Sequence, residues 1–118
     1  MADQCLQLAG IVGGQLLDHL RAHLAEPHTL DTLAAHTLMS RRTFTRRFHQ
    51  ATGLSVGEWL LAERLRRCQE LLEVSGHSIE RIAELIGFKS ATSLRNHFRA
   101  RFAVSPSEWR RAFGGNKP

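Results

Sequence analysis

Apolar residues recur along this chain with the period of an α-helix. Near the start, one stripe is formed by Leu16, Leu17, Leu20 and Leu24. The longest stripe, at spacings of four, three and four, comprises Leu61, Leu65, Cys68 and Leu72. Such spacing places each set on one face of a helix. No run alternates apolar and polar residues, and no Asn-Gly or Asp-Gly pair marks a hairpin. The pattern therefore predicts an all-α fold.

Residues that are typical of helix ends lie between these apolar stripes. Hydroxyl residues that can cap a helix N-terminus are Thr29, Ser40, Ser55, Ser78, Ser90 and Ser105. Ser55 and Ser105 each precede a glutamate by three positions, which is the spacing of a capping box. Gly53 and Gly87 stand where a left-handed turn residue is wanted, and Pro27 is expected to close the first helix. Together these signals predict about seven helices, the longest being Val56–Val74.

The chain also repeats itself. Five residues return fifty positions later: Ser40, Phe48, Ser55, Glu58 and Trp59 as Ser90, Phe98, Ser105, Glu108 and Trp109. Upstream of these the separation is forty-nine, because one turn is a residue longer, and the residues that return are Thr29, Leu30, Leu33 and Ala34 as Ser78, Ile79, Ile82 and Ala83. An internal repeat of this kind indicates one small module that has been duplicated. We expect residues 1–54 to form an N-terminal helix and a first helix-turn-helix subdomain, residues 55–74 a linker helix, and residues 75–118 a second such subdomain with a C-terminal helix.

Each repeat consists of a short helix, a tight turn and a basic helix, as in a helix-turn-helix. At about 100° per residue, Phe44 and Phe48 point to the core in the first basic helix, as do Leu94 and Phe98 in the second. The opposite faces and their flanks carry Arg42, Thr45, Arg46 and His49, and then Thr92, Arg95, Asn96 and Arg99. Arginine can donate two hydrogen bonds to guanine, asparagine can form two hydrogen bonds with adenine, and the threonine methyl group can contact the methyl group of thymine. These faces predict contacts with bases.

Charge supports this interpretation. The net charge is +5, and of sixteen basic residues only Lys89 and Lys117 are lysines. Residues 40–51 and residues 89–102 each hold four basic residues and no acid. A basic helix face is usually only solvated, and a GC-rich genome also favours arginine. Basic helices matched in both repeats, however, are the footprint expected of a polyanion-binding protein.

The stretch from Leu30 to Phe113 resembles the C-terminal DNA-binding domain of the AraC/XylS family of bacterial transcription regulators. The matching motifs are Leu33-Ala34-Ala35, Met39-Ser40-Arg41-Arg42-Thr43-Phe44, Arg47-Phe48, Thr52-Gly53, Arg64-Leu65, Leu71-Leu72, Ile82-Ala83, Gly87-Phe88 and Val104-Ser105-Pro106-Ser107-Glu108-Trp109-Arg110-Arg111. Residues 91–99 are similar to the GlxA-like branch, whose members carry a further N-terminal domain. The resemblance implies two recognition helices that enter successive major-groove segments on one face of the duplex.

By this resemblance and the helix geometry, the base-reading positions are Arg42, Thr45, Arg46, Ala91, Thr92, Arg95 and Asn96. Phosphate contacts are assigned to Ser40, Arg41, His49, Lys89, Ser90 and Arg99. Two residues depart from the family pattern. Ala103 replaces the usual glycine, and because a left-handed alanine costs about 1 kcal/mol, a different turn is expected there as an alternative. Asn96 replaces a residue that is basic in many members, which leaves the base at that position open.

Other chemistries find little support. His19 and His23 have a zinc-compatible spacing, but no His-Glu-x-x-His motif or cysteine pair accompanies them, so we interpret them as a polar outer face. We expect no metal, no cofactor and no enzymatic activity, since neither a Ser-His-acid set nor a glycine-rich phosphate loop is present. Cys5 and Cys68 are interpreted as free thiols, the latter in packing. No signal peptide or membrane span is expected.

Three interpretations follow. The favoured one is a regulator that binds double-stranded DNA sequence-specifically; the others are a nucleic-acid binder without sequence preference and a helical protein-interaction module. RNA polymerase is a second candidate partner. We expect a monomeric, cytoplasmic, nucleoid-associated segment, with any effector or dimerisation domain absent or N-terminal to it. The GlxA-like resemblance favours a fragment of a longer regulator. The operator, the regulated genes, the effector and the sign of regulation do not follow from the sequence.

Overall fold

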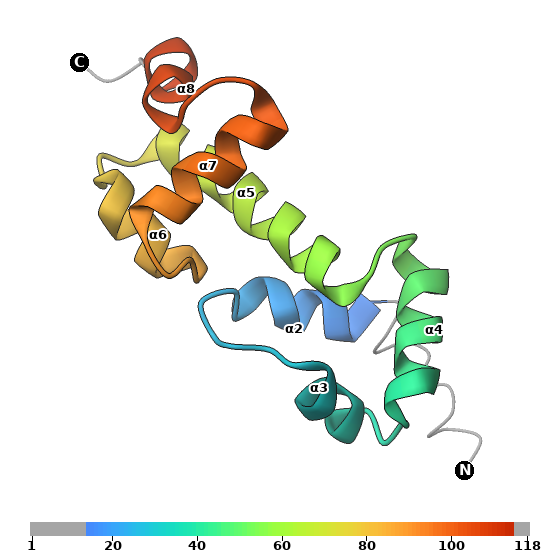
Figure 1. Cartoon of the computed structure of the whole chain (residues 1–118). Helices are drawn as coiled ribbons and strands as arrows, with labels where there is room; N and C mark the ends of the chain where they lie inside the picture. The colour runs from blue at the N-terminus through green and yellow to red at the C-terminus, as the bar shows by residue number, and fades with distance from the viewer. Residues whose placement is uncertain (1–13, 115–118) are drawn as a thin grey trace. The chain divides into compact units, whose positions relative to one another are not determined.

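A computed structural model describes residues 14–114, and this part of the chain contains seven α-helices and no strand. In chain order the helices are α2 (Leu16–Ala22), α3 (Leu30–His36), α4 (Arg41–Thr52), α5 (Val56–Val74), α6 (Ile79–Ile86), α7 (Ala91–Phe102) and α8 (Pro106–Phe113) (Figure 1). The all-α prediction is confirmed, and the long helix has the bounds that the sequence predicts. The first helix is shorter than expected, because α2 ends at Ala22 and not at Pro27.

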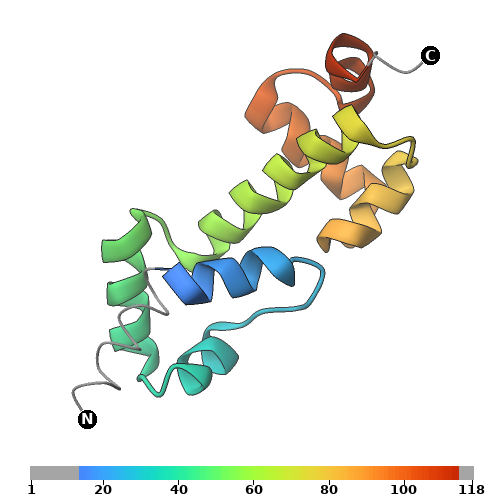
Figure 2. The same cartoon turned by 180° about the vertical axis from the view of Figure 1, so that it is seen from behind.

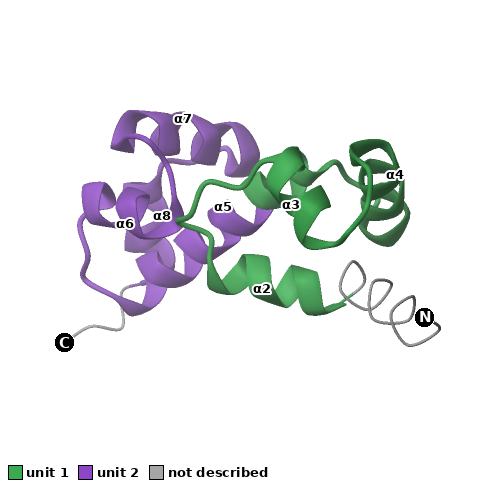
Figure 3. Ribbon diagram, turned by 90° about the horizontal axis from the view of Figure 1, so that it is seen from below, with its two compact units in different colours: residues 1–61 green, residues 62–118 purple. Residues whose placement is uncertain are grey.

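The chain forms two compact units, residues 1–61 and residues 62–118 (Figure 3). The boundary between them falls inside α5, which is one continuous helix (Figure 2). The first turns of α5 therefore belong to the first unit and the remaining turns to the second. Each unit contains one short helix followed by one basic helix: α3 and α4 in the first, α6 and α7 in the second.

The predicted caps define the helix ends. Among the N-cap hydroxyls that accept a backbone N–H three residues further on are those of Thr29, Ser40, Ser78, Ser90 and Ser105. At the start of α5, Ser55 Oγ accepts from the Glu58 N–H at 3.1 Å, while Glu58 Oε1 accepts from the Ser55 N–H at 3.0 Å. Ser105 and Glu108 repeat this reciprocal pair at the start of α8. Both predicted capping boxes are confirmed.

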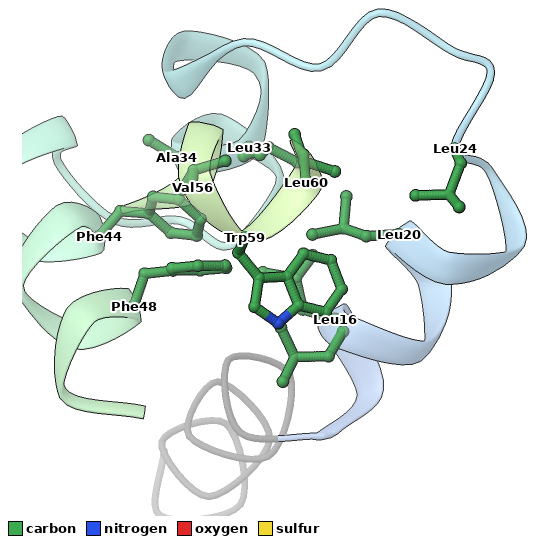
Figure 4. Close-up of a cluster of buried hydrophobic side chains, with 11 residues drawn as sticks. Leu16, Leu20, Leu24, Leu33, Ala34, Phe44, Phe48, Val56, Trp59 and Leu60 are labelled. Carbon is green, nitrogen blue, oxygen red and sulfur yellow. The ribbon is translucent and has the colours of Figure 1, made fainter. Parts of the chain in front are cut away.

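Aromatic residues from α4 and α5 form the centre of the first unit. Phe44 and Phe48 are fully buried, and their cluster includes Leu16 and Leu20 of α2 (Figure 4). Trp59 of α5 lies edge-on to Phe48, with 6.0 Å between ring centroids. This packing fixes which side of α4 faces inward, and it makes Trp59 an anchor of the core.

The second unit uses the repeated residues in the same way. Leu94 and Phe98 of α7 are fully buried, and Trp109 of α8 lies edge-on to Phe98, again with 6.0 Å between centroids. Trp109 also donates its indole N–H to Glu73 of α5 at 2.9 Å. Arg110 donates to backbone carbonyls at the end of α5. The last helix is thereby attached to α5 by both apolar and polar contacts.

Within residues 14–114, four residues between the helices adopt left-handed backbone conformations. Gly53 and Gly87 do so as predicted, with φ of 76° and 93°. Ala103 also does so, with φ of 67°, so the alternative of a different turn at this position is wrong. Leu38, at the turn between α3 and α4, has φ of 60° and is 70% exposed. The sequence pattern does not predict this conformation, although Leu38 lies forty-nine positions before Gly87 and is its counterpart in the repeat.

Candidate nucleic-acid interface

The interface begins with the outward face of α4. Because Phe44 and Phe48 are buried, the side chains opposite them lie in solvent, as the helix angles predict. The exposed candidates on this helix are Arg41, Arg42, Thr45, Arg46 and His49. An open hollow of about 440 Å³ is lined by Leu30 of α3 and by Arg41, Arg42, Thr45 and Arg46. Predicted base-reading and phosphate-contacting residues therefore surround one depression at the start of α4.

The arginines of this hollow differ in their partners. Arg41 pairs with Asp31 of α3, with 3.2 Å between Nε and Oδ1. Neither Arg42 nor Arg46 makes an ion pair with any of residues 14–114. The hollow consequently carries two guanidinium groups whose donors can turn to an external acceptor.

The second candidate face lies on α7. Thr92, Arg95 and Asn96 are exposed, and Ala91 is half-buried at the first position of the helix. The base-reading candidates of this helix thus lie on its solvent side, opposite Leu94 and Phe98. Two hydrogen-bonding side chains of different chemistry, a guanidinium and an amide, stand next to each other here. This face therefore differs from that of α4, where two arginines dominate.

Two arginines of α7 hold carboxylates from other helices. Arg95 Nη2 lies 3.3 Å from Glu80 Oε2 of α6, and Arg99 Nη1 lies 3.5 Å from Glu108 Oε1 of α8. All four side chains are well exposed. The sequence pattern does not predict Glu80 and Glu108 as neighbours of these arginines. A signal existed, because Glu80 and Asp31 fall at equivalent points of the repeat.

The helix starts carry the remaining phosphate candidates. The hydroxyls of Ser40 and Ser90 accept from the backbone N–H groups of Thr43 and Ser93, so they are occupied as caps. Lys89 is exposed beside Ser90. The first backbone N–H groups of each helix have no partner within the helix, and the positive end of the helix dipole lies there. Such helix starts suit an anionic oxygen.

Hydrogen bonds extend the ionised range of the acids around these helices to lower pH. Backbone and side-chain hydrogen bonds from Ser55 and Ser105 lower the pKa of Glu58 and Glu108, respectively. The pKa of Glu80 is lowered by its own backbone N–H and then by Arg95. The negative charges next to α7 are therefore permanent near neutral pH.

Three histidine rings of the first unit, those of His19, His23 and His36, lie close together. The rings of His19 and His23 have centroids 4.3 Å apart, and His36 stacks on His19 at 6.0 Å. Burial, with neighbouring histidines, lowers the pKa of His19. Across residues 14–114, no group of three or more histidine, cysteine or acidic side chains is placed to hold a metal ion. In the same range, no helix combines the length and the apolar character needed to cross a membrane.

Two units, each presenting a basic helix behind a short helix and a tight turn, define a duplicated helix-turn-helix protein. Residues 33–112 match the family model described as a helix-turn-helix domain. The chain belongs to this family in its AraC-type form, which confirms the resemblance seen in the sequence. The more specific GlxA-like assignment stays a prediction.

Solved structures and curated relatives agree with this assignment. The DNA-binding domain of the global transcriptional factor AdpA, solved in complex with a target DNA, is 39% identical, with a TM-score of 0.81 over 88% of this chain and 94% of that one. An AraC-type regulator from Chromobacterium violaceum is 27% identical, with a TM-score of 0.80 over 90% and 95%. The transcriptional activator RhaR of Pectobacterium carotovorum is 35% identical over 83% of this chain. The chain spans about a third of the length of such curated relatives, 34% of RhaR and 39% of the right origin-binding protein of Escherichia coli.

Proposed function

We propose that this chain binds double-stranded DNA sequence-specifically, as the DNA-binding domain of a bacterial transcription regulator. The observation that carries the proposal is the pair of helices α4 and α7, each packed by buried apolar residues on one side and lined with base-reading groups on the other. The AdpA domain, similar over most of its length, was solved on its target DNA. Its likeness to this chain supports the same kind of ligand here.

The roles of individual residues follow from their exposure and chemistry. For base reading we propose Arg42, Thr45 and Arg46 of α4, together with Ala91, Thr92, Arg95 and Asn96 of α7. For phosphate contacts we propose Ser40, Arg41, His49, Lys89, Ser90 and Arg99. Both sets lie on the solvent side of their helices or at helix starts. Arg42 and Arg46 suit guanine, and Asn96 suits adenine.

The two faces point to an asymmetric DNA site. The repeats share their buried residues and caps but differ on the outside, since the arginine pair of α4 is replaced on α7 by Thr92, Arg95 and Asn96. We propose that α4 and α7 enter successive major-groove segments, with α5 as the linker between two subdomains. One copy of the chain then suffices for a non-palindromic site. RNA polymerase is a further proposed partner, and we propose a non-enzymatic, cytoplasmic role.

Selection of bound sequences from random duplex DNA tests this function. The expected result is one non-palindromic motif, bound about 10³-fold or more above random duplex, with affinity falling steeply as salt rises. Equal binding of all sequences would identify a nucleic-acid binder without preference. A chain that binds no duplex at low salt is not a DNA-binding domain. In that case pull-down by purified RNA polymerase would support the protein-interaction module.

A further inference from the structure

Asp31 and Glu80 occupy the same position in the two repeats. Each is the second residue of the short helix that precedes a recognition helix, α3 or α6. Each places its carboxylate against an arginine of that next helix, Arg41 at 3.2 Å and Arg95 at 3.3 Å. The same device, a carboxylate from the short helix that holds a guanidinium of the basic helix, therefore appears twice.

The two arginines held in this way are not equivalent. Arg41 is the first residue of α4, a phosphate-contact position, whereas Arg95 lies one turn into α7, at the position of Thr45 in the repeat. In the second unit, the carboxylate of Glu80 is thus paired with Arg95, a base-reading candidate. In the first unit, Arg42 and Arg46 carry no ion pair with any described residue.

A carboxylate at this distance restricts where an arginine can reach. A free arginine side chain has about 2 kcal/mol of rotamer entropy to lose, and near DNA its nearest acceptor is often a phosphate. Glu80 engages Nη2 alone, which leaves the other donors of Arg95 available. The negative charge also disfavours a close approach of Glu80 to the DNA backbone. An exposed ion pair contributes little to folding stability. We therefore expect the Glu80–Arg95 pair to affect DNA binding and not folding.

We propose that Glu80 is a specificity-determining positioning residue, which holds Arg95 toward a base edge and away from the phosphate backbone. The inference rests on the proposed DNA-binding function. In the first unit, Asp31 holds Arg41 at the helix start, where only a phosphate contact is proposed. The first unit therefore contains no counterpart to this control of a base-reading arginine.

The test compares Glu80→Gln with Glu84→Gln. Glu84 is on the same helix and its ion pair, at 2.9 Å, is with Arg81 of α6 itself, so both variants lose one charge but only one releases Arg95. The base pair read by Arg95 is first located as the one whose preference disappears in Arg95→Ala. A bidentate contact discriminates about 5- to 150-fold. Glu80→Gln is expected to remove most of that preference, while Glu84→Gln keeps it.

Two further variants separate positioning from charge and folding. Glu80→Asp keeps the charge and the acid at the helix start but shortens the reach, and it is expected to lose the preference as Glu80→Gln does. In an Arg95→Ala background, Glu80→Gln is expected to change no base preference. Thermal unfolding of every variant reports its folding.

The outcomes distinguish this inference from the proposed function. If the unchanged chain selects a site but Glu80→Gln and Glu80→Asp keep the full preference, Glu80 does not position Arg95, and the proposed function stands. If Arg95→Ala alters no base preference, the inference fails in the same way. If the unchanged chain shows no preference for any duplex sequence, both the function and the inference are overturned.

Discussion

Gly53 and Ala103 share one left-handed backbone conformation at equivalent points of the two repeats. Their φ and ψ angles are 76° and 2° for Gly53, and 67° and 3° for Ala103. In both, the residue ends a recognition helix and donates its N–H to the carbonyl four residues earlier. The turn geometry is therefore set by the packing of the repeat and not by the presence of glycine.

Ala103 should accordingly carry a conformational strain that Gly53 avoids. Replacing Ala103 by glycine is expected to stabilise the chain by about 1 kcal/mol, because left-handed backbone disfavours a Cβ by about that amount. The midpoint of urea unfolding measures the change. An Ala103→Gly variant that unfolds at lower urea would contradict this account.

The reverse substitution provides the matched control. At Gly53 an added Cβ would meet nothing within 4 Å, so Gly53→Ala is expected to destabilise through backbone strain alone, again by about 1 kcal/mol. At Gly57, in the first turn of α5, a Cβ also meets nothing within 4 Å. There the same Gly→Ala change is expected to stabilise by about 0.5 kcal/mol through helix propensity. If Gly53→Ala lowers the stability of the chain and Gly57→Ala raises it, the positive φ of Gly53 accounts for the loss.

The sequence predicted what depends on local pattern and repetition. Helix starts followed from capping residues such as Ser55 and Ser105, and the inward side of α4 from the spacing of Phe44 and Phe48. Features that depend on packing between elements were not predictable. The Glu80–Arg95 pair joins residues fifteen positions apart on different helices, and a side-chain partner of this kind is set by how α6 packs on α7.

The left-handed Leu38 escaped prediction for a related reason. Its counterpart Gly87 carries a recognisable turn residue, whereas leucine gives no local signal for a positive φ. Only alignment of the two repeats indicates that Leu38 stands where a left-handed residue is needed. The repeat is thus more informative about this turn than the residue itself.

The capping boxes predict a loss of stability in acid. Because hydrogen bonds from Ser55 and Ser105 lower the pKa of Glu58 and Glu108, the ionised carboxylates stabilise the folded chain above their ordinary value of 4.5. That contribution is lost as the pH falls through the lowered values. Glu108→Gln keeps a capping acceptor but carries no charge. It is expected to unfold at a lower temperature than the unchanged chain at pH 7.

Thermal unfolding across pH gives the measurement. The difference in Tm between the unchanged chain and Glu108→Gln should shrink between about pH 5 and pH 3, as the native carboxylate is protonated. Glu58→Gln should behave in the same way at the start of α5. A difference in Tm that stays constant over this range would show that the charge of the capping glutamate does not stabilise the fold.

Cys68 is expected to be chemically inert while the chain is folded. Its side chain is fully buried on α5, and burial raises the pKa of the thiol to about 12, despite the opposing charge of Arg110. Because thiolate is the reactive form, a thiol reagent at pH 8 should not modify Cys68. The experiment uses a Cys5→Ala background, since Cys5 lies outside the described residues. One thiol should react after denaturant is added, and rapid reaction of the folded chain would contradict the packing role.

Arg46 provides the most direct test of base reading on α4. It lies opposite Phe44 and Phe48, is exposed, and makes no ion pair with residues 14–114. Arg46→Ala is expected to cost about 1–3 kcal/mol of binding to the selected site and to relax preference at one base pair. Arg47→Ala removes the same charge from the side of the helix, so it is expected to weaken all sequences alike. Competition binding with single-base variants of the site measures both effects. If Arg46→Ala also weakens every sequence equally, Arg46 contacts phosphate, and base reading by α4 depends on Arg42 and Thr45.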